Sequence, residues 1–125
     1  MQMLNQNVTT LNTSNYTITD ISAELASAWV TSGEAILLDI REQEELEMEW
    51  IPGATPMSFS KFDISAVAKM ESKKIIVICL TGRRSKIAAR QLWEHGISEV
   101  YNVKDGLLAW TAAGLETIDQ SALMI

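Results

Sequence analysis

The sequence predicts a single α/β domain with a mostly parallel central sheet and helices on both faces. Two runs, Ala35 to Ile40 and Lys74 to Cys79, are continuously apolar, which is the pattern of strands buried on both sides. Helical patterns alternate with these and with shorter strand-like runs, an order typical of parallel sheets. A chain of 125 residues with 47% hydrophobic residues fits one compact core.

The other elements follow from local patterns. Ile21 to Val30 has the spacing of an amphipathic helix, with Ser22 or Asp20 available as its N-cap. The Lys74 to Cys79 strand is dense in β-branched residues. The further helices are expected at Gln43 to Met48, Ile64 to Met70, Arg84 to His95 and Leu107 to Ala113. The further strands are expected at Thr55 to Met57, after the turn Ile51-Pro52-Gly53-Ala54, and at Glu99 to Val103.

The ends of the chain are expected to lie outside the domain. Residues 1–17 are polar and rich in Asn and Thr, so we expect a flexible tail whose removal leaves folding intact. The domain is expected to span residues 18–118, followed by a second tail at 119–125. No apolar run approaches the roughly 18 residues that cross a bilayer, and the N-terminus lacks the pattern of a signal peptide. We therefore expect a cytoplasmic protein with no membrane partner; nothing in the sequence predicts its oligomeric state.

Charge is segregated along the chain. The net charge of −6 argues against a nucleic-acid partner, which would need a cationic face. Six of the ten cations and none of the sixteen acids lie between Ser72 and Trp93, a stretch that also contains the only cysteine, Cys79. The segment Asp39 to Glu49 holds six acids and one cation. These acids are read as a solvated face or as a docking surface for a basic partner.

Cys79 is the candidate nucleophile. It ends a predicted parallel strand, where ligands bind in such sheets, and a predicted helix begins shortly after it. Amides at that helix start, together with Arg83, Arg84 and Lys86, favour ionisation of the thiol below its usual pKa of about 8.5. The alternative is a buried cysteine that only fills space. Gly82 and the neighbouring arginines favour the functional interpretation, because they suit an anion-binding loop.

Four ordered motifs resemble those of the rhodanese family. Cys79 to Ser85 (CLTGRRS) resembles the rhodanese active-site loop, and Asp39 to Glu42 (DIRE), Ile51 to Ala54 (IPGA) and Asp105 to Trp110 (DGLLAW) resemble its other signature segments. Together they cover roughly residues 18–117. The resemblance implies a three-layer domain, a persulfide intermediate on Cys79, and no metal or organic cofactor.

The resemblance also implies a reaction. The Cys79 thiolate would attack the outer sulfur of a small anionic donor, such as thiosulfate or a persulfide, and then pass that sulfur to cyanide, a thiol or a protein acceptor. These two half-reactions predict ping-pong kinetics. Because the chain has one cysteine, the acceptor must come from outside it.

The loop residues carry individual expectations. Arg84 matches the basic residue late in the family loop and is expected to hold the anion or the loop itself. Arg83 stands where the family often has a polar residue. Thr81 and Ser85 could donate hydroxyl hydrogen bonds to the sulfur, and Ser85 could equally serve as a helix-start residue. Leu80 replaces the basic residue of many thiosulfate-using rhodaneses, which leaves the donor open.

Residues outside the loop are expected to have structural roles. Asp39 and Arg41 are expected to tie neighbouring loops together by an ion pair. Trp50 replaces a histidine that the family commonly has and is expected to pack at the rim of the site. Trp110 is expected in the core. His95 is expected to cap a helix C-terminus and not to act as a catalytic base.

Three alternatives to an active sulfurtransferase stay open. One is a sulfur-relay or binding module that takes persulfide from a partner protein. Another is a redox sensor built on an exposed thiol of low pKa. The third is a cysteine-dependent phosphatase or arsenate reductase, but phosphatase loops run Cys-x5-Arg. Here Cys79 and Arg84 form Cys-x4-Arg, a shorter loop that suits a sulfur atom better than a tetrahedral phosphate.

Overall fold

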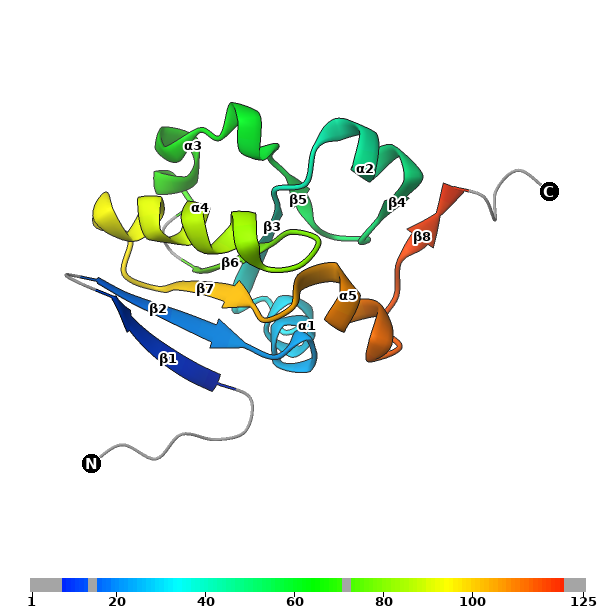
Figure 1. The fold of residues 1–125 in the computed structure, drawn as a ribbon, viewed down its shortest axis with the longest axis horizontal. Helices are drawn as coiled ribbons and strands as arrows, with labels where there is room; N and C mark the ends of the chain where they lie inside the picture. The colour runs from blue at the N-terminus through cyan, green and yellow to red at the C-terminus, as the bar shows by residue number, and fades with distance from the viewer. Residues whose placement is uncertain (1–7, 14–15, 71–72, 121–125) are drawn as a thin grey trace.

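The computed structural model describes residues 8–13, 16–70 and 73–120, which form a layered α/β domain around a six-stranded sheet (Figure 1). The strand order is β1-β2-β7-β6-β3-β5, and every neighbouring pair is parallel except the antiparallel pair β1–β2. The strands are β1 (Val8–Thr13), β2 (Tyr16–Ile21), β3 (Ala35–Asp39), β5 (Thr55–Pro56), β6 (Lys74–Ile78) and β7 (Val100–Val103). The predicted mostly parallel sheet is confirmed.

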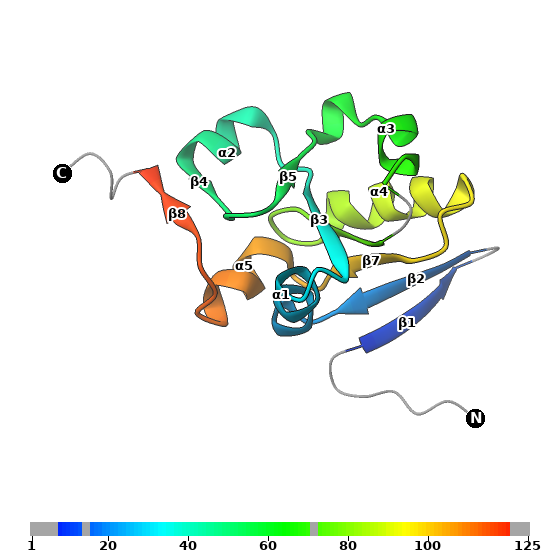
Figure 2. The same ribbon diagram turned by 180° about the vertical axis from the view of Figure 1, so that it is seen from behind.

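Helices cover both faces of the sheet, as predicted (Figures 1 and 2). Helices α1 (Ala23–Thr31) and α5 (Gly106–Ala112) pack on one face, and α3 (Ile64–Ala68) and α4 (Arg83–Glu94) pack on the other. The short helix α2 (Gln43–Met48) follows the carboxyl end of β3, and a 3-10 turn spans Phe59–Lys61. The boundaries expected for these elements differ from the observed ones by at most two residues, and those of α2 coincide.

The central strands are buried on both faces, which explains why they appear as continuous apolar runs. In β6, Ile76 and Ile78 face the α1 and α5 layer, whereas Ile75 and Val77 face the α3 and α4 layer. All four are fully buried. Each such side chain contributes roughly 1.5–3 kcal/mol by leaving water. This burial holds the carboxyl end of β6 rigidly in the middle of the sheet.

One of the two candidate caps of the first helix is selected. Ser22 is the N-cap of α1, and its Oγ accepts a hydrogen bond from the Leu25 N–H at 3.1 Å. Asp20 lies on β2 with a buried side chain that binds Asn102 instead. Asp20 lies two residues before the N-cap of α1, and its carboxylate is engaged by Asn102 on the neighbouring strand.

The N-terminal segment differs from the expected tail. Residues that were expected to be flexible form β1 and the start of β2, paired from Val8 opposite Ile21 to Thr13 opposite Tyr16. Low hydrophobicity predicts a tail here, but threonine also has high β propensity, which favours the two strands that form. The sheet therefore begins before residue 18. Residues 1–7 and 14–15, which the same expectation covered, lie outside the described residues.

A second, two-stranded sheet joins the segment that follows α5 to the segment that follows α2. Strand β4 (Glu49–Trp50) pairs antiparallel with β8 (Ile118–Asp119). This pairing extends one residue into the expected C-terminal tail, of which 121–125 lie outside the described residues. Two-residue strands carry no periodicity, so the sequence did not predict this sheet. Across the described ranges, no helix has the length and apolar character needed to cross a bilayer.

Candidate active site

Cys79 follows directly after β6, between the ends of β3 and β7, and its side chain is 1% exposed. Its sulfur accepts hydrogen bonds from two backbone amides, Gly82 N–H at 3.1 Å and Ser85 N–H at 3.4 Å. Gly82 has a φ of +99°, the left-handed region that favours glycine, and it directly precedes α4. The chain thus curls around the sulfur and enters the helix with its amides pointing at Sγ.

These contacts favour the thiolate of Cys79. Burial opposes ionisation, but hydrogen bonds from the Ser85 hydroxyl and from the amides of Ser85, Gly82 and Thr81 outweigh it. The pKa of the Cys79 thiol is therefore lower than that of an ordinary cysteine. A thiol poised in this way can act as a nucleophile or hold a sulfur atom.

A series of hydrogen-bonded, buried polar side chains leads from the sulfur to β7 and then to the neighbouring strand β2. Ser85 Oγ lies 3.3 Å from Cys79 Sγ and donates a hydrogen bond to Asn102 Oδ1. Asn102, on β7, donates from Nδ2 to Asp20 Oδ1 at 2.8 Å. All three polar residues are buried. The Ser85 hydroxyl carries one proton, which it donates to Asn102 Oδ1 beside a neutral thiol and can turn toward Sγ when Cys79 is a thiolate.

Helix α5 holds the backbone of the cysteine loop from the other side. Its first amides bind loop carbonyls: Leu107 N–H donates to Cys79 O at 2.8 Å, and Leu108 N–H donates to Leu80 O at 3.3 Å. Gly106 lies so close that an added Cβ would overlap the Cys79 carbonyl oxygen and approach Leu80 O to 2.6 Å. Only glycine permits this approach at a φ of +53°.

Arg84 is engaged by an acid from another element. Its Nη1 lies 2.7 Å from Glu45 Oε1 and its Nη2 lies 3.0 Å from Oε2, a bidentate ion pair with helix α2. The hydrogen bond to Glu45 raises the pKa of Arg84, and the reciprocal bond lowers the pKa of Glu45. Lys86 Nζ lies 3.8 Å from Asp20 Oδ2, whereas the side chain of Arg83 is exposed. The cationic sequence around Cys79 is therefore largely neutralised in three dimensions.

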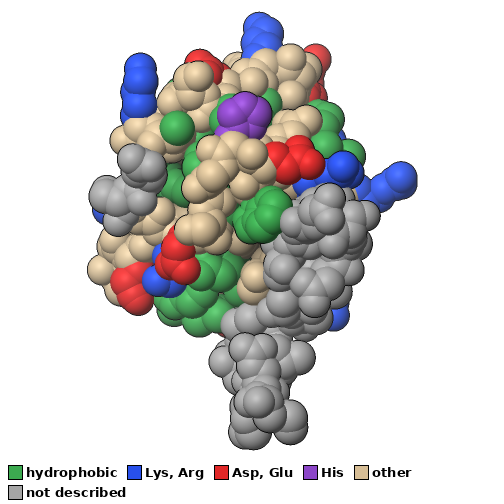
Figure 3. All heavy atoms as spheres, turned by 90° about the vertical axis from the view of Figure 1, so that its left-hand side faces the viewer, with side chains coloured by type: hydrophobic (Ala, Val, Ile, Leu, Met, Phe, Trp, Pro, Cys, Tyr) green, Lys and Arg blue, Asp and Glu red, His purple; other side chains and the backbone are tan. Residues whose placement is uncertain are grey.

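The wider surface is mixed in charge. On the face seen in Figure 3, basic side chains are scattered among acidic and polar ones instead of gathering into one patch.

His95, at the C-cap of α4, is exposed, and its Nδ1 lies 3.1 Å from Gln91 O. These features place the histidine at the helix end, as expected.

Asp39 and Arg41 form a buried ion pair beneath the loop that follows β3. Arg41 Nη2 lies 2.8 Å from Asp39 Oδ2, and the same nitrogen donates to Glu49 O at 2.9 Å. The Asp39 carboxylate also accepts from the Arg41 backbone N–H at 3.1 Å. Through these contacts the pair joins the end of β3 to β4.

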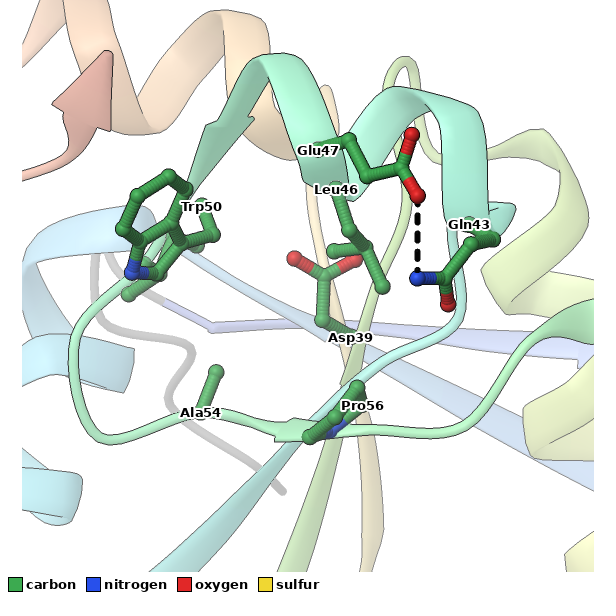
Figure 4. Close-up of a pocket in the computed structure, with 8 residues that line it drawn as sticks. Asp39, Gln43, Leu46, Glu47, Trp50, Ala54 and Pro56 are labelled. Carbon is green, nitrogen blue, oxygen red and sulfur yellow. Dashed lines mark hydrogen bonds between the residues drawn. The ribbon is translucent and has the colours of Figure 1, made fainter. Parts of the chain in front are cut away.

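A pocket of about 240 Å³ lies beside α2 (Figure 4). Trp50 forms one wall, Ala54 and Pro56 lie opposite α2, and the Asp39 carboxylate points into the space. The eight lining residues all lie between Asp39 and Pro56, so none belongs to the loop from Cys79 to Ser85. Trp50 therefore packs against this pocket, and its expected place at the rim of the cysteine site stays a prediction. Trp110 is buried, and its Nε1 donates to Glu116 O at 3.0 Å.

Four residues that support the site were not among the sequence candidates. They are Asp20, Glu45, Asn102 and Gly106. Gly106 lies inside the motif Asp105 to Trp110, and Glu45 lies inside the acidic segment Asp39 to Glu49. The sequence therefore marked both segments, but it did not indicate which residues of the cysteine loop they would contact. Nothing local marks Asn102, whose contact with Asp20 joins positions 82 apart.

The fold and this loop together define a class: a three-layer α/β domain with one cysteine cradled at the start of a helix. The family model for the Rhodanese-like domain matches residues 22–113. The chain belongs to this family.

Curated relatives carry names of sulfur-handling proteins. The chain is 38% identical over 95 residues to the "Putative sulfur carrier protein YrkF" of Bacillus subtilis (strain 168), matching 75% of this chain and 51% of that one. It is 30% identical to the "Sulfurtransferase" of Allochromatium vinosum, matching 81% and 95% of the two chains. A "Thiosulfate sulfurtransferase GlpE" from Pseudoalteromonas translucida is also 30% identical, over 70% of this chain and 83% of its own. The chain spans about half the length of the first curated relatives it matches.

Solved structures agree with the fold. The thiosulfate sulfurtransferase of Pseudomonas aeruginosa superposes with a TM-score of 0.69 at 28% identity, over 80% of this chain and 20% of that one. The Rhodanese-like domain of Anabaena Alr3790 superposes with a TM-score of 0.68 at 25% identity, over 82% and 78% of the two chains. The predicted three-layer architecture is confirmed.

Proposed function

We propose that this chain transfers sulfane sulfur through a persulfide on Cys79. The observation that best supports this proposal is the set of contacts to Sγ. The Gly82 and Ser85 amides and the Ser85 hydroxyl all lie within hydrogen-bonding distance of this one sulfur atom. Membership of the rhodanese-like family, and the names of its sulfurtransferase and sulfur-carrier relatives, support this choice.

In the first half-reaction, the Cys79 thiolate attacks the outer sulfur of the donor. With an organic persulfide, the new S–S bond forms on Cys79 as the donor's S–S bond breaks, giving Cys79–S–SH and a thiolate, RS⁻. With thiosulfate, the products are Cys79–S–S⁻ and sulfite, SO₃²⁻. The loop amides and the Ser85 hydroxyl stabilise the negative charge on Cys79 before the attack.

In the second half-reaction, an external acceptor attacks the outer sulfur and regenerates the Cys79 thiolate. The chain has one cysteine, so it supplies no second thiol for this step. Cyanide would leave as thiocyanate, and a thiol would leave as a persulfide. The two steps share one enzyme intermediate, and ping-pong kinetics follow.

One alternative loses support from the geometry. A phosphatase would need its loop arginine free to bind phosphate, but Arg84 is bound bidentately by Glu45. The redox-sensor alternative needs an oxidant to reach Cys79 just as sulfur transfer needs a donor to reach it, so the 1% exposure of Cys79 does not separate the two. A sulfur-relay role keeps support, because exposed Leu80 and the neutralised Arg84 do not favour a small dianionic donor.

The test is sulfur transfer from thiosulfate or glutathione persulfide to cyanide, followed as thiocyanate, in wild type and Cys79→Ser. We expect turnover with at least one donor that the substitution abolishes. Mass spectrometry of the protein after donor treatment should show the addition of one sulfur atom on Cys79. Failure of a folded wild type to gain that sulfur from either donor would contradict the proposal.

A further inference from the structure

The structure assigns Glu45 the role of a specificity residue, one that biases the Cys79 site against dianionic donors and toward donors of lower charge. This inference rests on the proposed function, because it concerns which donor loads Cys79. Glu45 lies on α2, outside the cysteine loop, yet both its carboxylate oxygens bind the guanidinium of Arg84.

The position of Glu45 is fixed by its own helix. Besides Arg84, Glu45 Oε1 accepts a hydrogen bond at 2.9 Å from the backbone N–H of Glu42, the residue that caps α2. The Glu42 carboxylate in turn accepts from Ser60 N–H at 3.0 Å and from Ser60 Oγ at 2.7 Å. The acid is therefore held ready to pair with the arginine and does not have to be ordered by it.

The ion pair between Arg84 and Glu45 lowers the positive electrostatic potential near the Cys79 sulfur. Arg84 directly precedes Ser85, whose N–H lies 3.4 Å from Cys79 Sγ, so Arg84 belongs to the same first turn of α4 that holds the sulfur. Besides the hydrogen bond to Glu45, a negative charge on Cys79 contributes to raising the pKa of Arg84. Glu45 places a negative charge 2.7 Å from the Arg84 guanidinium and cancels much of the positive field that Arg84 produces at longer range. The side chains are 29% and 31% exposed, which leaves the pair partly shielded from water.

Apart from Arg84, the loop from Cys79 to Ser85 carries one cation, Arg83, whose side chain is exposed. Leu80, the residue next to the nucleophile, is apolar and 37% exposed. Lys86 lies 3.8 Å from the buried carboxylate of Asp20. A donor with two negative charges would therefore approach an already negative thiolate with Arg83 as the remaining cation of the loop, whereas a neutral or singly charged persulfide meets less repulsion.

Two donors that deliver the same kind of sulfur atom but differ in net charge can test this role of Glu45. Thiosulfate carries two negative charges, and methanethiosulfonate, CH₃SO₂S⁻, carries one. Each delivers its outer sulfur to the Cys79 thiolate and releases sulfite or methanesulfinate, CH₃SO₂⁻. The rate of persulfide formation on Cys79, followed by mass spectrometry in a single turnover, measures loading without an acceptor.

The decisive variant is Glu45→Gln, which removes the charge but keeps the side-chain size. We expect the thiosulfate-to-methanethiosulfonate ratio of loading rates to rise about fivefold to tenfold, because a partly shielded unit charge is removed from the site. Added salt should reduce this gain, since it screens the freed Arg84 charge. Glu44→Gln is the matched control: Glu44 is an exposed acid of the same helix, and its loss should leave the ratio unchanged.

A double variant ties the effect to the ion pair. In Glu45→Gln/Arg84→Gln the gain should disappear, because the freed cation is no longer present. Glu45 has no such role if loading by both donors is measurable and the ratio in Glu45→Gln matches wild type, or if Glu44→Gln raises the ratio equally. Absence of loading by these donors and by glutathione persulfide in every folded variant would overturn the proposed function together with this inference.

Discussion

At the scale of single residues, Ser85 sits between two acceptors. Its Oγ lies 3.3 Å from Cys79 Sγ and donates to Asn102 Oδ1, and its backbone N–H also faces the sulfur. The sequence left two roles open for Ser85, a ligand of the sulfur or a helix-start residue. The geometry supports both, because the residue lies in the first turn of α4 while its amide and hydroxyl reach Sγ.

Ser85→Ala should raise the pKa of the Cys79 thiol. The hydroxyl has one proton, which turns from Asn102 Oδ1 to Sγ when the thiolate forms, so it lowers that pKa in the wild type. Its removal leaves burial opposed only by backbone amides. The thiolate fraction near neutral pH falls, so persulfide formation slows there and recovers as pH rises. The ultraviolet absorbance of the thiolate against pH measures the shift, with Cys79→Ser as the blank. Ser98→Ala, at an exposed serine, should leave the titration unchanged, and a titration of Ser85→Ala that matches wild type would contradict this role.

Asp20 and Asn102 should be coupled energetically. The Asn102 amide is fully buried and donates to a carboxylate that is 4% exposed, so removing either partner leaves a buried polar group without its bond. Asn102→Ala and Asp20→Ala should each lower the free energy of unfolding by about 1–3 kcal/mol. In the double variant the losses should fall short of their sum by about 0.5–3 kcal/mol, as urea denaturation would measure.

A comparison cycle with Lys86→Ala sets the scale of that coupling. Lys86 Nζ lies 3.8 Å from Asp20 Oδ2 and its side chain is 44% exposed, so its coupling to Asp20 should be well below 1 kcal/mol. Equal coupling in the two cycles would mean that charge, and not the buried amide bond, holds Asp20 in place.

At the scale of elements, the strands and helices with clear periodicity were predictable. β3 and β6 are buried on both faces, and their apolar runs mark them directly. Helix α4 buries Ala88, Ala89 and Leu92 on one side, the spacing that predicts a helix. The β1–β2 hairpin and the two-residue strands β4 and β8 were missed, because polar or very short strands give no such signal.

Helix α5 makes a prediction at this scale. Gly106→Ala should destabilise the domain by more than about 2 kcal/mol and slow loading of Cys79, because the new Cβ would meet the carbonyls of Cys79 and Leu80. Gly33→Ala is the matched control: it has a φ of +83° and nothing within 4 Å of an added Cβ. It should cost only about 1–2 kcal/mol, the penalty of left-handed backbone. Equal losses of thermal stability in the two variants would show that the close approach carries no cost of its own.

At the scale of the whole molecule, the site combines residues that no local pattern joins. The loop from Cys79 to Ser85 was identified by its sequence, but its supports come from β2, α2, β7 and the start of α5. Strand order decides these contacts: β7 lies between β2 and β6, which brings Asn102 within reach of both Asp20 and Ser85. Sequence motifs therefore identified the candidate nucleophile, whereas topology assembled the groups that surround it.

The N-terminal strands give the last prediction. Deleting residues 1–15 removes β1 and leaves β2 as the edge of a sheet whose other pairs are parallel. Deleting residues 1–21 also removes Asp20 and Ile21, which is 1% exposed and belongs to the core beneath α1. The shorter deletion should keep a cooperative thermal transition with a lowered Tm and still load sulfur on Cys79, whereas the longer one should abolish the transition, as circular dichroism would measure. If the shorter deletion alone abolished the transition, β1 would be essential to the fold; if the longer one melted like wild type, the sheet would not depend on β2.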